Sequence, residues 1–309
     1  MDVIELVYGT LFLLQIVFGV LGNVFLLLLY MHMLFTNRQV ILPDLILAHL
    51  TLANTMALLS RGVPDLLSAW GLNNFLDDVG CKTLLYIYRA SRGLAICTTC
   101  LLSVFQSVTI SPGTSRWARV KTQLPKCILP SCLFSWILNL LIDMPTPIFV
   151  TGPQNGTNIN SIIILKYCSS VSIRAVTALV NAVLLSFRDL FFLGLMSVAS
   201  GHMVLVLHRH HRQVRHLHGP GRSPREMPEV RAAKRVVALV TLYILLYGRD
   251  TITLSFLFNM KKISPLILNS NNIMSFTFSA VSPFLMILSD RRVRTFWKRD
   301  SPIANWDPS

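Results

Sequence analysis

The sequence predicts an all-α membrane protein, built as a bundle of seven transmembrane helices. Two observations lead to this fold class. Of the 309 residues, 53% are hydrophobic and only 14% are charged, whereas soluble domains usually carry about 25% charged residues. The apolar residues also gather in runs that are long enough to cross a bilayer, which takes about 20 residues of helix at ~1.5 Å per residue.

Seven such runs follow one another along the chain. They cover roughly 7–31, 44–68, 82–110, 125–149, 181–206, 236–258 and 266–288. The fourth run contains Pro130, Pro145 and Pro147, which neighbouring helices of a bundle can accommodate. We therefore expect three regions, namely a short extracellular N-terminus at 1–6, a transmembrane domain at 7–288 and a cytoplasmic tail with a short amphipathic helix at 289–309.

Lysine and arginine are distributed unevenly between alternate loops. Eighteen of the 28 lie in the segments 32–43, 111–126, 208–235 and 289–309, and five lie in the other loops. Because basic loops stay in the cytoplasm, we expect the N-terminus outside and the C-terminus inside. The one N-glycosylation sequon, at Asn155, falls in a loop assigned to the outside, where glycosylation takes place.

The net charge of +14 would suggest a nucleic-acid partner in a soluble protein. Here the basic residues border a membrane, so we expect no nucleic-acid partner. Anionic lipid headgroups and an acidic protein surface are the partners that such a basic rim attracts. The loop from His208 to Arg235 also contains glycine and proline, and we expect it to be partly extended.

The six cysteines fall into two groups. Cys81, at the outer end of the third run, and Cys168, in the loop with the sequon, both face the oxidising side, where they form a disulfide or remain two free thiols. Their position favours the disulfide. The others are interpreted as packing residues in or near the membrane: Cys97, Cys100, Cys127 and Cys132. The cysteines show no CxxC pair with a second CxxC or paired histidines, so we expect no zinc site. The histidines from His208 to His218 have metal-like spacing but alternate with arginines, which favours a solvated basic face, and we expect no metal site and no cofactor.

Charged residues also lie inside the predicted spans. Measured inward from the outer ends, eight of them fall in one layer roughly 9–17 Å deep: Arg61, Arg89, Arg92, Asp143, Arg188, Asp189, Arg249 and Asp250. Asp65 lies nearer the rim. Charges at such depth must pair or face water.

Two interpretations of this layer are open. In the first, the charges pair with one another and fix the register of the helices, which suits five arginines and four aspartates. In the second, some arginines face an outward-opening cavity and bind a carboxylate or sulfate of a ligand. The candidates for that role are Arg89 and Arg92, which lie three residues apart on one helix face, followed by Arg188 and Arg249.

Long ordered motifs along the chain resemble those of the vomeronasal type 1 receptors, a family of rhodopsin-like G-protein-coupled pheromone receptors. The motifs include HLTLAN (49–54), CTTCLLS (97–103), TISP (109–112), SWILN (135–139), YCSS (167–170), LHRHH (207–211) and FTFSAVSPF (276–284). The resemblance covers nearly the whole chain. The third span ends in FQS (105–107), without the acidic-Arg-aromatic triplet of the wider rhodopsin-like superfamily, so the activation switch is not identified by motif.

The resemblance implies a plasma-membrane, multi-pass chemosensory receptor that performs no enzymatic reaction. Its partners would be a small chemosignal in the outer half of the bundle and a heterotrimeric G protein of the inhibitory class. The candidate G-protein-facing residues are basic and lie in the loops assigned to the cytoplasm: Arg116, Arg119, Arg209, Arg212 and Arg235. The alternative is a seven-span transporter or channel without G-protein output, although the matching halves that many transporters show are not evident.

Overall fold

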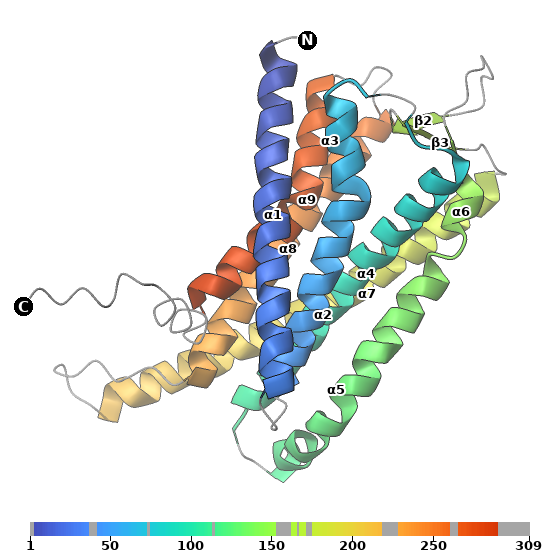
Figure 1. Cartoon of the computed structure of the whole chain (residues 1–309). Helices are drawn as coiled ribbons and strands as arrows, with labels where there is room; N and C mark the ends of the chain where they lie inside the picture. The colour runs from blue at the N-terminus through green and yellow to red at the C-terminus, as the bar shows by residue number, and fades with distance from the viewer. Residues whose placement is uncertain are drawn as a thin grey trace, which may run out of the picture.

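Long helices that run alongside one another make up most of the structure, which is a computed structural model (Figure 1). They correspond to the apolar runs of the sequence. The structure describes residues 3–36, 42–72, 75–112, 115–152, 162–165, 167–170, 175–217, 228–259 and 265–289. The sequon at Asn155 and the tail helix expected within 289–309 lie outside the described residues, apart from Ser289.

The elements follow one another in the predicted order. The first three long helical segments are α1 (Val3–Thr36), a continuous rod of α2 (Leu42–Ala57), η1 (Leu58–Gly62) and α3 (Val63–Ala69), and then α4 (Asp78–Ile110). The next four are α5 (Ser115–Ile142) with the short α6 (Thr146–Phe149), α7 (Ala175–Leu217), α8 (Pro228–Asn259) and α9 (Pro265–Ser289). Among the described residues, five helical stretches are long and apolar enough to cross a membrane, and α9 holds a shorter apolar stretch.

The predicted fourth span needs a correction. Helix α5 begins at Ser115 rather than near 125 and contains two prolines, Pro125 and Pro130. The helix ends at Ile142, and residues 143–145 form a turn before α6. Pro145 and Pro147 lack the N–H group that would continue the helix. The turn is stabilised by the Thr146 N–H group, which donates to the Asp143 carbonyl at 2.9 Å.

The loop at 208–235, expected to be partly extended, is helical in the parts that the structure describes, and its glycine and proline stretch lies outside the described residues. Helix α7 continues to Leu217, and α8 already begins at Pro228. Arg209 and Arg212 are therefore exposed side chains on the last turns of α7.

Helix α4 forms the centre of the bundle, where it packs against α2, α5, α7 and α8. Its side chains join a buried apolar core with those of the neighbouring helices, including Leu50, Leu102, Met203 and Leu239. Helices α5 and α7 instead turn apolar side chains outward, with Phe134 62% exposed and Val198 74% exposed. Apolar faces of this kind suit contact with lipid.

A small sheet covers one end of the bundle, beside the beginning of α4 (Figure 1). Its antiparallel strands stand in the order β1 (Val150–Thr151), β3 (Cys168–Ser170) and β2 (Ile162–Leu165). Cys81 and Cys168 form the predicted disulfide, with their sulfur atoms 1.97 Å apart. The disulfide fixes β3 to α4, and this end of the molecule is called the disulfide end below.

The disulfide gives a first prediction. It closes a sequence separation of 87 residues, and a loop of about this length corresponds to roughly 4–5 kcal/mol in the chain-entropy account. We expect Cys168→Ser to lower the melting temperature of the purified receptor in detergent by many degrees. Cys127→Ser is the matched control, because Cys127 is free and exposed. Equal melting temperatures for the two variants would contradict the stabilising role.

Candidate functional site

A widened turn in the second span orients Arg61. Residues Leu58–Gly62 form a π-helical turn between α2 and α3, and Pro64 follows without the N–H group that would bond to the Ser60 carbonyl. Such π turns often occur at functional sites. Here the turn directs the guanidinium of Arg61 toward α4 and α9, where its central carbon lies 4.8 Å from the ring centre of Tyr88 and 5.8 Å from that of Phe276.

Asp65 connects Arg61 to the sheet at the disulfide end. Its Oδ2 atom lies 3.3 Å from Arg61 Nε, and its Oδ1 atom accepts a hydrogen bond of 2.6 Å from the Tyr167 hydroxyl. Burial, reinforced by the negative charge of Asp65, raises the pKa of Tyr167. The Tyr167 hydroxyl therefore keeps its proton at neutral pH and acts as the donor.

Two more arginines pair around one buried carboxylate. Asp143 is 1% exposed, and its Oδ2 atom accepts a hydrogen bond of 3.0 Å from Arg188 Nη1. Its Oδ1 atom lies 3.3 Å from Arg89 Nε. Arg188 also donates to Asp189 Oδ1 at 2.9 Å and to Asn139 Oδ1 at 3.2 Å. The turn that ends α5 thus supplies the carboxylate that pairs with arginines from α4 and α7.

Gly93 provides the space for this network on the surface of α4. A Cβ atom there would overlap Asn139 Oδ1 and would lie 2.6 Å from Arg188 Nη1. Any residue with a side chain at position 93 would push both partners away from their hydrogen bonds. The requirement for glycine is therefore one of close approach, since Gly93 lies in a regular helix.

A pocket lies on the other side of α4, between α2, α4, α8 and α9. It holds about 530 Å³ of empty space, its open mouth included. The lining is mostly apolar and aromatic with a few polar groups: Ala57, Tyr88, Arg92, Ala95, Tyr243, Leu246, Met274, Ser275, Phe276, Phe278 and Ser279. A lining of this composition, apolar and aromatic with a few polar groups, is typical of sites that bind small organic molecules.

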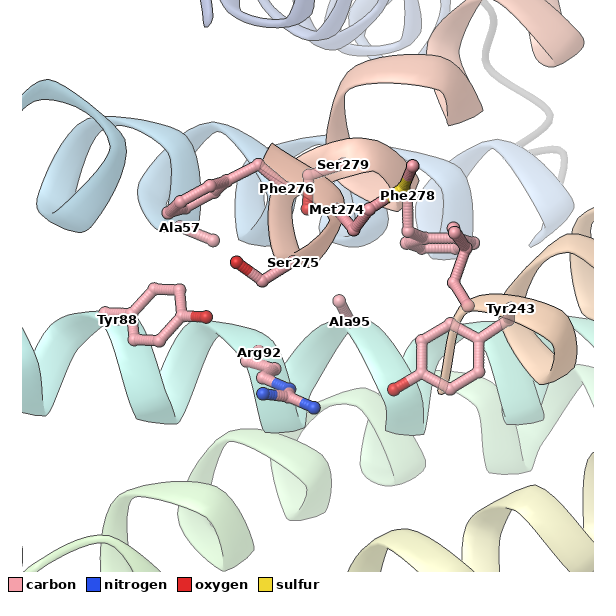
Figure 2. A pocket seen from close by; sticks show the side chains of 11 residues that line it. Ala57, Tyr88, Arg92, Ala95, Tyr243, Met274, Ser275, Phe276, Phe278 and Ser279 are labelled. Carbon is pink, nitrogen blue, oxygen red and sulfur yellow. The ribbon is translucent and has the colours of Figure 1, made fainter. Parts of the chain in front are cut away.

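Figure 2 shows how the polar groups of the pocket are placed. Tyr88 and Arg92 stand on α4 and Ser275 on α9, and the hydroxyl groups of Tyr88 and Tyr243 are directed toward Arg92 from opposite sides in this view. The Tyr88 and Phe276 rings, 5.9 Å apart between centroids, form the pocket wall nearer the disulfide end. Arg92 can therefore present donors to a ligand within an aromatic enclosure.

The structure separates the arginines that the sequence grouped together. Arg89 and Arg188 belong to the Asp143 network, whereas Arg92 borders the pocket. Arg249 lies on α8, but its side chain is outside the described residues, as is that of Arg116. Of the other basic candidates, Arg119, Arg209 and Arg212 are exposed, and Arg235 is half-buried.

Several pocket residues were missed by sequence reasoning. Tyr88, Tyr243, Ser275 and Phe276 are ordinary residues of apolar helices, and only the packing of α4, α8 and α9 brings them together. One signal was available for Tyr88, because it lies four residues before Arg92 and therefore on the same face of the helix. The aromatic residues of the other two helices carried no such signal.

The long apolar helices define a class, the helical membrane proteins. More specifically, this chain belongs to the vomeronasal organ pheromone receptor family, whose model matches residues 7–299. It is 40% identical to human vomeronasal type-1 receptor 4 over 293 residues, covering 92% of this chain and 96% of that receptor. Olfactory receptor class A-like protein 1 of Danio rerio is 36% identical to this chain, and the match covers 95% of this chain and 92% of that protein. The chain is thus a multi-pass receptor of the plasma membrane and a member of a chemosensory receptor family.

The space at Gly93 gives a second prediction. We expect Gly93→Ala to lower the melting temperature and the surface level, because overpacking of a filled site costs about 1–3 kcal/mol. Gly194→Ala and Gly201→Ala are matched controls, since a Cβ atom at either position meets nothing within 4 Å. Both controls should keep or raise the stability, as alanine is the better helix former. Equal melting temperatures for all three variants would contradict the close packing at Gly93.

Proposed function

We propose that this chain binds a small chemosignal in the pocket between α2, α4, α8 and α9, and that binding activates a heterotrimeric G protein of the inhibitory class. The observation that carries the proposal is the position of Arg92, a cationic side chain on the wall of a mostly apolar pocket. Membership of a chemosensory receptor family supports signalling to a G protein rather than transport or a chemical reaction.

Arg92 is the residue to which we assign recognition of ligand charge. Arg89 and Arg188 lie against the Asp143 carboxylate and outside the pocket lining, so they serve the helix packing in this proposal. Arg61 lies against the rings of Tyr88 and Phe276 and does not line the pocket either. A carboxylate or sulfate in the pocket would match the planar guanidinium of Arg92 with two parallel hydrogen bonds.

The end of the bundle opposite the disulfide provides the output surface in this proposal. Exposed arginines lie there near the beginning of α5 and at the end of α7, namely Arg119, Arg209 and Arg212. The excess of lysine and arginine in these segments assigns them to the cytoplasm. A basic surface there would attract both anionic lipid headgroups and an acidic surface of a G protein. The ligand would act by favouring the conformation that the G protein binds.

Arg92 gives a third prediction. The cells are challenged with anionic and neutral fractions of small molecules from secretions. We expect Arg92→Ala to raise the concentration of the anionic fraction needed for a half-maximal response about tenfold to a hundredfold, which is the effect of losing a charged hydrogen bond. Arg92→Lys should retain part of the response, because it keeps the charge but not the planar fork. The measurement is G-protein activation at matched surface level.

Responses to the neutral fraction serve as the internal control for that experiment, and they should change little in either variant. An equal loss for anionic and neutral fractions would show that Arg92 does not recognise ligand charge. A full response of Arg92→Ala to the anionic fraction would contradict the assignment outright.

A further inference from the structure

A continuous line of contacts runs from the sheet at the disulfide end to the wall of the pocket. Tyr167 donates a hydrogen bond to one oxygen of Asp65 at 2.6 Å, and Arg61 pairs with the other oxygen at 3.3 Å. Arg61 then lies over the rings of Tyr88 and Phe276. Both rings line the pocket that also contains Arg92.

Four of the five members of this line are buried, and Arg61 is half-buried. Tyr167, Asp65, Tyr88 and Phe276 are at most 8% exposed. The Tyr167 ring packs on Phe75 at 5.6 Å between centroids, and the next residue along the chain is a disulfide cysteine. The phenol is therefore anchored to α4 independently of Asp65, so its hydroxyl can act as a fixed point for the carboxylate.

We propose that Tyr167 is a positioning residue for the ligand pocket. Its hydroxyl fixes Asp65, and Asp65 in turn fixes Arg61. Arg61 then holds the rings of Tyr88 and Phe276 together as a closed wall of the pocket. A cation over an aromatic face is attracted most strongly when it is held near the ring centre. Release of Asp65 from Tyr167 allows Arg61 to move, and both rings then lose the cation that orders them. The pocket wall thereby depends on a residue outside the pocket. This proposal rests on the proposed function only in taking the pocket to be the ligand site; the ordering of the pocket wall by Tyr167 does not depend on it.

The test uses the reactivity of a cysteine placed in the pocket, which needs no ligand. Ser275 lines the pocket and is half-buried, so Ser275→Cys in a Cys127→Ser background gives a thiol in the pocket next to Phe276 in the chain. The probe is a negatively charged methanethiosulfonate reagent added to the full-length receptor. We expect Tyr167→Phe to raise the modification rate about tenfold, the factor for one hydrogen bond to a charged group.

The matched control is Tyr86→Phe. Tyr86 lies on α4, and its hydroxyl donates to the Leu140 carbonyl at 3.0 Å. This hydrogen bond is outside the line of contacts from Tyr167 to the pocket. A rate raised by Tyr167→Phe and unchanged by Tyr86→Phe supports the proposal. An unchanged rate in Tyr167→Phe overturns it, and so does an equal rise in both variants, because that would indicate general loosening of the bundle. Tyr167→Phe keeps the ring and the disulfide, and a single cooperative melting transition verifies that the variant is folded.

A double variant tests whether the effect passes through Asp65. If it does, Tyr167→Phe adds nothing to the rate already raised by Asp65→Asn, because the carboxylate that positions Arg61 has gone. Additive increases would overturn the proposed line of contacts. Ligand response is a separate readout: a receptor that responds to no fraction would fail the proposed function, while the labelling rates would still decide the role of Tyr167.

Discussion

The structure depends on one physical constraint, that a charge inside a membrane bundle needs a partner. Leaving one member of a buried ion pair without its partner costs about 3–5 kcal/mol. Asp143 meets this constraint for two arginines at once, because its two oxygens face Arg89 from α4 and Arg188 from α7. The break between α5 and α6 therefore has a structural purpose, since it places this carboxylate at the centre of three helices. Gly93 completes the arrangement by leaving room on α4 for the guanidinium of Arg188.

The pairing of these charges divides the surface of α4 into two functional sides. One side holds the Asp143 network, which ties α4 to α5 and α7. The other side borders the pocket, where Arg92 lies among aromatic rings from α8 and α9. Arg89 and Arg92 stand only three residues apart, yet their surroundings give them different chemistry. In the proposed function, Arg89 stabilises the bundle and Arg92, in the pocket lining, recognises the ligand, while the sheet at the disulfide end orders the pocket wall.

Much of this architecture is predictable from the sequence, because its causes are local or compositional. Apolar runs predict the long helices, and the positions of Cys81 and Cys168 predict their disulfide. Hydrophobicity alone could not predict the turn at 143–145 or the π turn around Arg61, because each depends on how prolines fit the neighbouring helices. Depth along a helix predicted a layer of charges but not which of them meet. The partners of Arg89 and Arg188 follow from the rotation of α4, α5 and α7 about their axes, and an unaligned sequence carries little information about that rotation. The aromatic half of the pocket was missed for the same reason.

The most direct test of the account is an experimental structure of the receptor with a bound activating ligand and its G protein. We expect ligand density between α2, α4, α8 and α9, in contact with Arg92 and enclosed by Tyr88, Tyr243 and Phe276. We also expect Arg89 and Arg188 to remain paired to Asp143. Density elsewhere in the bundle with this pocket empty would contradict the central claim, as would a ligand bound directly by Arg89 with its pairing to Asp143 broken.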